Sequence, residues 1–372
     1  MIITENYCAT PKQPYKTIRM KPSRSRFTPF TVAALALAGS ICSQALAQTA
    51  STTPVGFITL SVPGTSTLSP AGSGALTLAG LGMVQPITFQ GNADVVNTGT
   101  STITNNSATW TANQFAATSN PYFLEIASGP AAGVILDIAS NTSTTVTTTQ
   151  ALPAAFVANA SFIIRPHWTL SSVFGATGNA GLAIGNTSSA DQVLLYNGNT
   201  YDAYYYDNGQ GFVSPGWQKN NNPIDGTTVR IYPDQGILII RRQSASTQVV
   251  LTGAVKTGQT SVPIQSGNNV VGNVYGAGMT LADSGLYTGN SATGVASGTS
   301  TSADQVLIYN TTSSTYSAYY YDNGAGFFPA GWTSASGVAS GTVAIPVGSS
   351  IIVQRKIASA FNWVIPQHPT SF

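Results

Sequence analysis

Two histidines are the first residues to weigh for catalysis, because an imidazole can act as a general base. His368 lies among prolines near the C-terminus, and His167 lies in IIRPHWTL, where a strand is expected to end. A Ser-His-Asp site needs an acid and a nucleophile oriented around its histidine, and no G-x-S-x-G motif marks such a serine. We therefore expect His167 to be a boundary residue hydrogen-bonded to backbone, with a serine hydrolase as the unsupported alternative.

Paired carboxylates are the second candidates, because glycoside hydrolysis uses two of them. Glu125 and Asp137 lie in neighbouring expected strands, and we interpret them as single solvated residues on a hairpin. Two other acids recur, one copy of each in each repeat, which favours a structural device such as an Asx turn over a unique active site. A calcium loop needs several closely spaced oxygen ligands, and DNGQG supplies only the start of one. We expect no catalytic residue, no metal and no cofactor. The repeated acids are Asp191 with Asp304, and Asp207 with Asp322.

Aromatic residues are the strongest candidates for ligand binding, because flat rings can stack on sugars and also suit protein interfaces. Exposed, they would form a platform in each repeat; buried, they would be the core of a small module, and the sequence favours the core. A duplicated binding site and a duplicated core would both recur with this spacing. The rings are Tyr204, Tyr206 and Trp217, matched by Tyr319, Tyr321 and Trp332.

The first 47 residues have the pattern of a cleavable secretory signal. A basic segment precedes the apolar run FTPFTVAALALAGSIC (27–42), and Ala45 and Ala47 form the A-x-A pattern that signal peptidase reads. We expect cleavage after Ala47, with translation starting at either Met1 or Met20. The apolar run is too short and alanine-rich to span roughly 30 Å of hydrocarbon as a stable helix, so we expect no transmembrane anchor in the mature chain.

Removal of this leader changes the chemistry that is available. Cys8 and Cys42 leave with it, so the mature chain has no cysteine, and disulfides, thiolate nucleophiles and zinc–cysteine sites are excluded. Eight of the 14 basic and 11 of the 12 acidic residues remain, a net charge of about −3. Nucleic-acid binding needs clustered Lys and Arg, and only 241–242 and 355–356 are paired. We expect no nucleic-acid partner.

The composition of the mature chain indicates β-structure. Thr, Val, Ile and Tyr favour strands, and the abundant Asn and Gly favour turns. Regularly spaced apolar runs argue against disorder, the alternative for a polar chain of low charge. We predict an all-β fold: an N-terminal β-sandwich or small barrel domain followed by two duplicated small β-modules. Among the runs are VGFITLSV (55–62), PYFLEIA (121–127), QVLLYN (192–197) and GILIIRR (236–242).

An internal duplication sets the expected domain boundaries. ADQVLLYNGNTYDAYYYDNGQGFVSPGW (190–217) recurs as ADQVLIYNTTSSTYSAYYYDNGAGFFPAGW (303–332), with 20 of 28 aligned positions identical. Copies this similar predict one shared fold. The segment that links them loosely echoes the start of the mature chain. The predicted organisation is a signal peptide (1–47), an N-terminal β-domain (48–168), repeat 1 (169–248), a β linking segment (249–279) and repeat 2 (280–372).

Each copy is expected to contain a hairpin that ends in an Asp-Asn-Gly turn. A period of two puts Tyr201, Ala203 and Tyr205 on one face of the second strand. Tyr204 and Tyr206 then share the other face with the residue at 202, and we expect this face to be the wetter one. The closing strand reads Gln-Arg-Lys (354–356) in copy two where copy one has Ile-Arg-Arg (240–242), so we expect it to pack differently.

Three motifs carry a family resemblance over most of the mature chain. They are the SGPAAG turn, the RPHWTL junction and the closing segment that runs from a tryptophan to IIRR. With them the chain resembles an uncharacterised family of exported, paralogous, β-rich proteins of planctomycete- and verrucomicrobia-like bacteria. The resemblance implies secretion and the module boundaries. It brings no activity, cofactor or active site.

These patterns predict an exported, non-enzymatic structural or adhesive β-repeat protein of the cell surface or extracellular matrix. A periplasmic location stays open. The alternative is a carbohydrate-binding protein that uses the repeated Tyr and Trp platforms. Polysaccharide and other surface proteins are the partners that these two readings imply.

Overall fold

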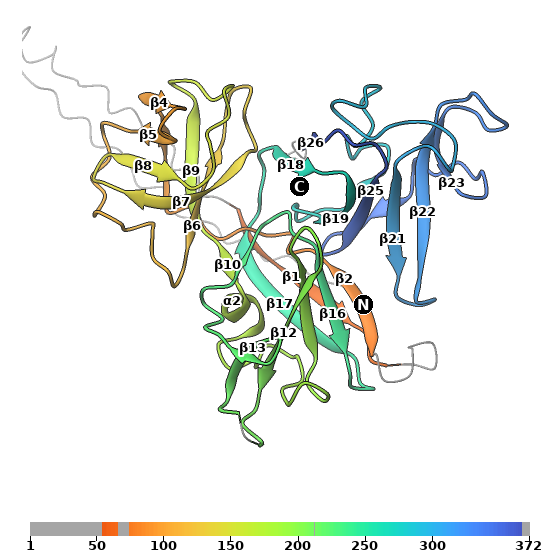
Figure 1. Ribbon diagram of the computed structural model, residues 1–372, viewed down its shortest axis with the longest axis horizontal. Helices are drawn as coiled ribbons and strands as arrows, with labels where there is room; N and C mark the ends of the chain where they lie inside the picture. The colour runs from red at the N-terminus through yellow and green to blue at the C-terminus, as the bar shows by residue number, and fades with distance from the viewer. Residues whose placement is uncertain (1–53, 66–73, 212, 367–372) are drawn as a thin grey trace, which may run out of the picture. The chain divides into compact units, whose positions relative to one another are not determined.

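The computed structural model describes residues 54–65, 74–211 and 213–366, and these residues form an all-β protein, as the composition predicts (Figure 1). One short helix, α2 (Leu170–Phe174), interrupts the strands of this described part. Thr169 caps it by accepting a hydrogen bond from the Ser172 amide, which satisfies a backbone donor that the helix leaves unpaired. The predicted signal peptide (1–47), including Ala45 and Ala47, lies outside the described residues.

A seven-stranded antiparallel sheet occupies the N-terminal part, in the order β3-β9-β6-β7-β8-β5-β4. Alternate residues of its central strands, among them Leu124, Phe162 and Ile164, enter one apolar core. A bulge between Ile138 and Ser140 shifts the register of β7 on β8. Its strands are β3 (Phe89–Asn92), β4 (Val95–Asn97), β5 (Thr102–Thr104), β6 (Tyr122–Ile126), β7 (Ile135–Asn141), β8 (Thr145–Thr148) and β9 (Ser161–Pro166).

The first repeat builds a six-stranded sheet in the order β14-β13-β12-β11-β16-β2. The β11–β12 hairpin turns at 197–200, where the Asn197 side chain accepts hydrogen bonds from the amides of Asn199 and Thr200. The strands are β2 (Ala75–Ala79), β11 (Gln192–Tyr196), β12 (Tyr201–Asp207), β13 (Gly216–Lys219), β14 (Asn222–Pro223) and β16 (Ile237–Arg241).

The second repeat builds a five-stranded sheet in the order β19-β25-β21-β22-β23. Its registers match the first sheet: Val193 faces Tyr204 and Ile239, and Val306 faces Tyr319 and Val353. The expectation that the closing strand packs differently in copy two is therefore wrong, because Gln354 replaces Ile240 at a partly exposed position while the inward residues stay apolar. The strands are β19 (Gly267–Gly272), β21 (Gln305–Asn310), β22 (Thr315–Asp322), β23 (Gly331–Ser334) and β25 (Ser350–Arg355).

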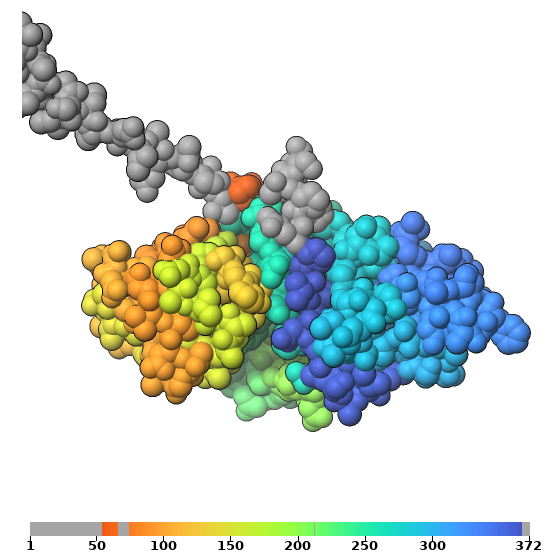
Figure 2. Space-filling model, turned by 90° about the horizontal axis from the view of Figure 1, so that it is seen from above, coloured from red at the N-terminus to blue at the C-terminus, as the bar shows by residue number. Residues whose placement is uncertain are grey.

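Four two-stranded ribbons complete the fold. Figure 2 shows β26 (dark blue) beside the teal segment that contains β18, as their pairing requires. The pairs are β1 (Val55–Val62) with β17 (Thr247–Ala254), β10 (Trp168–Thr169) with β15 (Arg230–Ile231), β18 (Thr260–Ile264) with β26 (Phe361–Ile365), and β20 (Met279–Thr280) with β24 (Ala344–Ile345).

The strand pairing crosses the predicted boundaries. β1 and β2 fall in the segment assigned to the N-terminal domain (48–168), yet β2 pairs with β16 of the first repeat and β1 pairs with β17, most of which falls in the linking segment. The seven-stranded sheet lies in the chain between β2 and β10, whereas in the second repeat β19 leads directly to β20. A strand joins the sheet that offers it matching hydrogen bonds and a core, wherever that sheet lies in the sequence.

The faces of β12 also differ from expectation. The period of two is present, but the face that carries Tyr204 and Tyr206 packs on the apolar core, so the expectation that it is the wetter face is wrong. The residue between them, Tyr205, is also buried and donates a hydrogen bond from its hydroxyl to Asn221 at 3.1 Å. Burial of large rings such as Tyr204 and Tyr206 contributes more free energy than the one aspartate of this face, Asp202, costs at the outer end of the strand.

Candidate functional site

Asp137 on β7 holds a cluster of polar side chains that joins the seven-stranded sheet to β15. Its Oδ1 lies 2.9 Å from His167 Nε2, and its Oδ2 accepts hydrogen bonds from Arg230 Nη1 at 2.8 Å and Tyr232 Oη at 2.6 Å. Asp137 is 4% and His167 2% exposed. The expectation of a solvated Asp137 is wrong, and the partner of the His167 ring is this carboxylate rather than backbone.

The electrostatics of this cluster determine which atoms carry protons. Burial alone would raise the pKa of Asp137, but the hydrogen bonds of His167 and Tyr232, with the charges of His167 and Arg230, lower it to about 2. Burial lowers the pKa of His167 more than Asp137 raises it. An ionised carboxylate only accepts hydrogen bonds, so Nε2 of a neutral His167 carries the proton that it donates.

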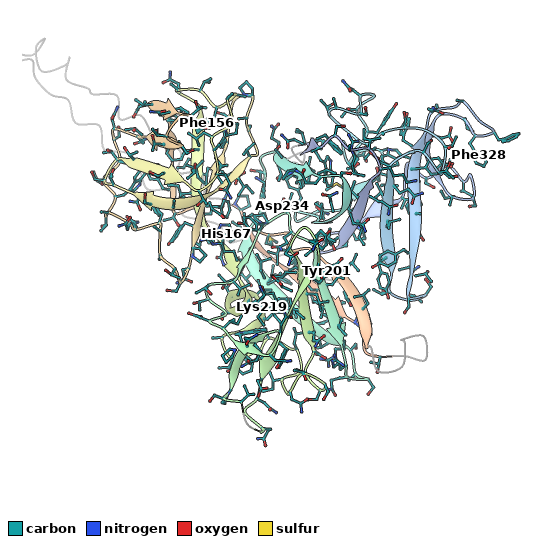
Figure 3. The ribbon with its side chains drawn as sticks, in the orientation of Figure 1. Phe156, His167, Tyr201, Lys219, Asp234 and Phe328 are labelled. Atoms are coloured by element: carbon teal, nitrogen blue, oxygen red, sulfur yellow. The ribbon has the colours of Figure 1, made fainter. Side chains whose placement is uncertain are left out.

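His167 Nδ1 is then a buried acceptor, and no hydrogen-bond partner for it is found among the described residues. The ring packs against Phe123 and Tyr232, with centroid separations of 4.8 and 4.9 Å. A general base needs hydrogen-bond reach to the proton that it abstracts. An imidazole enclosed in this way anchors two parts of the fold (Figure 3).

Glu125 on β6 forms a second buried cluster, so the expectation that it is solvated is also wrong. It pairs with the ammonium group of Lys256, which follows β17, and lies 3.6 Å from Arg165 Nε. Arg165 also donates to the Gln85 carbonyl at 2.8 Å. A buried charge is stable only with a charged or hydrogen-bonded partner. Glu125 and Asp137 thus each bind a different cation, and they act separately rather than as one pair.

A third kind of buried charge occurs once in each repeat. Arg241 donates to Asp191 at 2.5 Å, and Arg355 donates to Asp304 at 2.7 Å. Each carboxylate also accepts two backbone amides, at 2.7 and 2.8 Å in both repeats. Arg355 is 2% exposed. The matched pairs fix the closing strand of each sheet to the loop before its first hairpin, a structural role as the sequence predicts.

The second repeated acid is an Asx turn, which confirms that part of the prediction. Asp207 Oδ1 accepts from the Gly209 amide, and Asp322 Oδ1 accepts from the Gly324 amide, both at 2.8 Å. Gly209 and Gly324 both have φ of 76°, which is the conformation that glycine adopts without a steric cost.

The six predicted aromatic residues lie on β12, β13, β22 and β23. Trp217 is 4% and Trp332 is 7% exposed, and each belongs to the core of its own repeat. Tyr206 meets Trp217 edge-on at 5.7 Å, and Tyr321 meets Trp332 at 5.8 Å. The indole of Trp217 donates to the Gly175 carbonyl at 3.2 Å. The two indoles therefore present no exposed platform.

The four tyrosines of that set differ in exposure. Tyr204 is 5% exposed, and the ammonium of Lys219 lies 5.9 Å from its ring. Burial raises the pKa of Tyr204, and Lys219 opposes the shift. Tyr206, Tyr319 and Tyr321 are half-buried, and Tyr321 stacks on Tyr287 with 3.4 Å between centroids. Their ligand-binding role stays a prediction.

Sequence reasoning missed a cleft of about 520 Å³. It is lined by residues from the seven-stranded sheet, from the 196–198 and 232–235 turns, and from the β18–β26 ribbon with β19. In Figure 2 a hollow lies between the yellow segment that includes 134–150 and dark-blue β26. Glutamines and asparagines are frequent among its lining residues. They come from distant parts of the chain, so no local sequence motif indicates the cleft.

In the described ranges, no group of three or more His, Cys, Asp or Glu could hold a metal ion, and no helix is long and apolar enough to cross a membrane. Compared with models of protein families, with curated proteins and with solved structures, the chain matches none of them.

Proposed function

We propose that this chain is an exported, non-enzymatic β-protein with a structural or adhesive role at the cell surface or in the extracellular matrix. The observation that carries the proposal is that its buried acids form ion pairs between elements of the fold. Glu125, Asp137, Asp191 and Asp304 are each buried and bound to a cation of a different part of the fold. We infer that these buried ion pairs hold the strands in one arrangement, because removing either partner would leave an uncompensated buried charge.

Export is supported by the sequence alone. The basic segment, apolar run and A-x-A site predict removal of residues 1–47. Outside the cytoplasm, a chain without cysteines is insensitive to the redox state of its surroundings. A surface rich in Ser, Thr and Asn suits contact with hydrated polymers or with neighbouring proteins.

Cell fractionation and an attachment assay test this proposal. We expect the mature protein to begin at Gln48 and to be found in the surface or extracellular fraction. Cells that lack the gene should attach more weakly to a solid support, and complementation with the wild-type gene should restore attachment. A protein found in the cytoplasm with its leader intact would contradict the export. A purified chain that hydrolyses a glycan or an ester, and loses this activity when one residue is changed, would contradict the non-enzymatic role.

The alternative, carbohydrate binding on the repeated Tyr and Trp, finds less support. Sugar stacking needs an exposed ring face, and Trp217 and Trp332 are core residues. To stack on either indole, a sugar would have to displace the half-buried tyrosine that contacts it, Tyr206 or Tyr321.

A further inference from the structure

The cleft described above is built from segments that lie far apart in the chain. One wall is the outward face of the β18–β26 ribbon, with Ser261 and Asn362, and the neighbouring Gln265. A second is the turn that holds Asp234 and Gln235 before β16. The volume of about 520 Å³ falls within the roughly 300–1,000 Å³ of known small-molecule sites.

The polar groups of this cleft keep unused hydrogen-bonding capacity. The side-chain amides of Gln265 and Asn362 have no partner among the described residues, and both residues are exposed. Asn268 uses only its carbonyl oxygen, which accepts from Gln354 at 3.3 Å. Gln235 likewise uses its oxygen, accepting from the Tyr232 amide at 3.2 Å. Each amide therefore keeps at least one NH₂ donor available, and Gln265 and Asn362 keep their acceptors as well.

The charge of the cleft is low. Among the described residues, its lining includes no lysine, arginine or histidine, and Asp234 is its one ionisable acid (Figure 3). Burial raises the pKa of Asp234, while its own backbone amide and the charge of Lys256 oppose the shift. Tyr196 adds a partly exposed ring whose hydroxyl donates to the Gly198 carbonyl at 3.0 Å. Anions and phosphorylated ligands find no cation among the lining residues, and valines and a proline supply the apolar part of the wall.

We propose that this cleft binds a neutral oligosaccharide. Amides that donate and accept together, beside a carboxylate and a tyrosine ring, match vicinal hydroxyl groups and the apolar face of a sugar ring. The site is separate from the repeated aromatic residues, because none of those six lines it. The inference rests on the proposed adhesive function, for which it names the class of ligand.

Titration of the purified mature chain tests the assignment. The probes are maltohexaose, cellohexaose, xylohexaose, mannohexaose and chitohexaose, measured by calorimetry and by chemical-shift changes in NMR spectra. At least one should bind. Gln265→Ala and Asn362→Ala should each weaken this binding about fivefold, because a lost hydrogen bond to a neutral ligand is worth about 1 kcal/mol. The matched control is Gln248→Ala, an exposed glutamine on β17 outside the cleft. All three variants should keep the wild-type melting temperature.

Three results would overturn the assignment. One is that none of the five probes binds. Another is that a probe binds but all three variants bind it equally, which places the sugar elsewhere. The third is that hexalysine binds the cleft and the sugars do not, which makes Asp234 the determinant of a cationic ligand. Attachment lost in the deletion strain, combined with no sugar binding, would leave the adhesive function standing and reject only this site.

Discussion

The buried pair between Asp304 and Arg355 offers the sharpest test of how the repeats are held together. The perturbation is Asp304→Ala, compared with the double variant Asp304→Ala/Arg355→Met. In the wild type the carboxylate accepts from Arg355 and from the backbone amides of Ala296 and Lys356. The double variant also removes the cation and keeps a long side chain of similar volume.

The magnitudes follow from what each variant leaves unpaired. Removing one partner of a buried ion pair costs about 3–5 kcal/mol. Each of the two abandoned backbone donors adds roughly 1–3 kcal/mol if no water reaches it. We expect Asp304→Ala to lower the free energy of unfolding by about 5 kcal/mol or more, comparable with the roughly 5–15 kcal/mol that stabilises a whole domain. The double variant should recover part of this loss, because no charge is left buried alone, although the carbonyls of Ser291, Gly294 and Ser359 lose the donor that Arg355 provides.

The assay is urea-induced unfolding followed by tryptophan fluorescence, since Trp332 and Trp363 lie in the core of the same repeat. The control is Asp283→Ala, an exposed aspartate that accepts only from the Thr280 hydroxyl; it should cost less than about 1 kcal/mol. The reasoning is refuted if Asp304→Ala costs less than about 2 kcal/mol. It is equally refuted if the double variant is no more stable than the single one.

Four further predictions concern other parts of the fold. The pKa of Asp137 is 3.8 ordinarily and about 2 here, so about 2 kcal/mol of stability should be fully present above pH 4 and lost as the pH falls to 2; Asp137→Asn should abolish that loss in acid melting curves. The lowered pKa of His167 means that folding excludes its proton, so stability should also fall below pH 6.5, and His167→Gln should flatten this region. Trp217→Ala and Trp332→Ala should each cost about 3–5 kcal/mol, and calorimetric melting points that do not change would contradict their place in the core. Gly209→Ala should cost more than the roughly 1–2 kcal/mol of its positive φ, because the added Cβ would lie 2.6 Å from Pro215 Cγ; equilibrium unfolding measures this cost.

Much of the architecture could be predicted from the sequence because its signals are local. The apolar run at 192–197 and the Asp-Asn-Gly turn at 207–209 are encoded within a few residues, and each forms the expected strand or turn. Strand partners over long distances are not local. Nothing in the sequence of residues 75–79 indicates that this strand pairs with 237–241 rather than with a nearer strand.

The buried charges were misjudged for the same reason. An isolated acid between apolar residues, such as Glu125 or Asp137, looks like the outward position of an amphipathic strand. Its cation comes from a distant segment, Lys256 or Arg230, and only tertiary structure brings the two together. A signal did exist: in a chain with so few charges, an acid inside an apolar run needs a partner if it is buried. The cleft gave no such signal, because amides are common throughout the sequence.

The seven-stranded sheet lies in the chain between β1 and β2 on one side and their partner strands on the other. This order has a consequence for how the growing chain folds. Val55 faces Ala254 across the β1–β17 ribbon, so β1 must remain unpaired until most of the chain has followed it. The strands from 89 to 166 can pair among themselves much earlier, and non-local pairings form late in general. Asp137 and Glu125 would then stay hydrated until Arg230 and Lys256 are in place. Formation of these ion pairs is the step that fixes the early-formed seven-stranded sheet to the strands that form later.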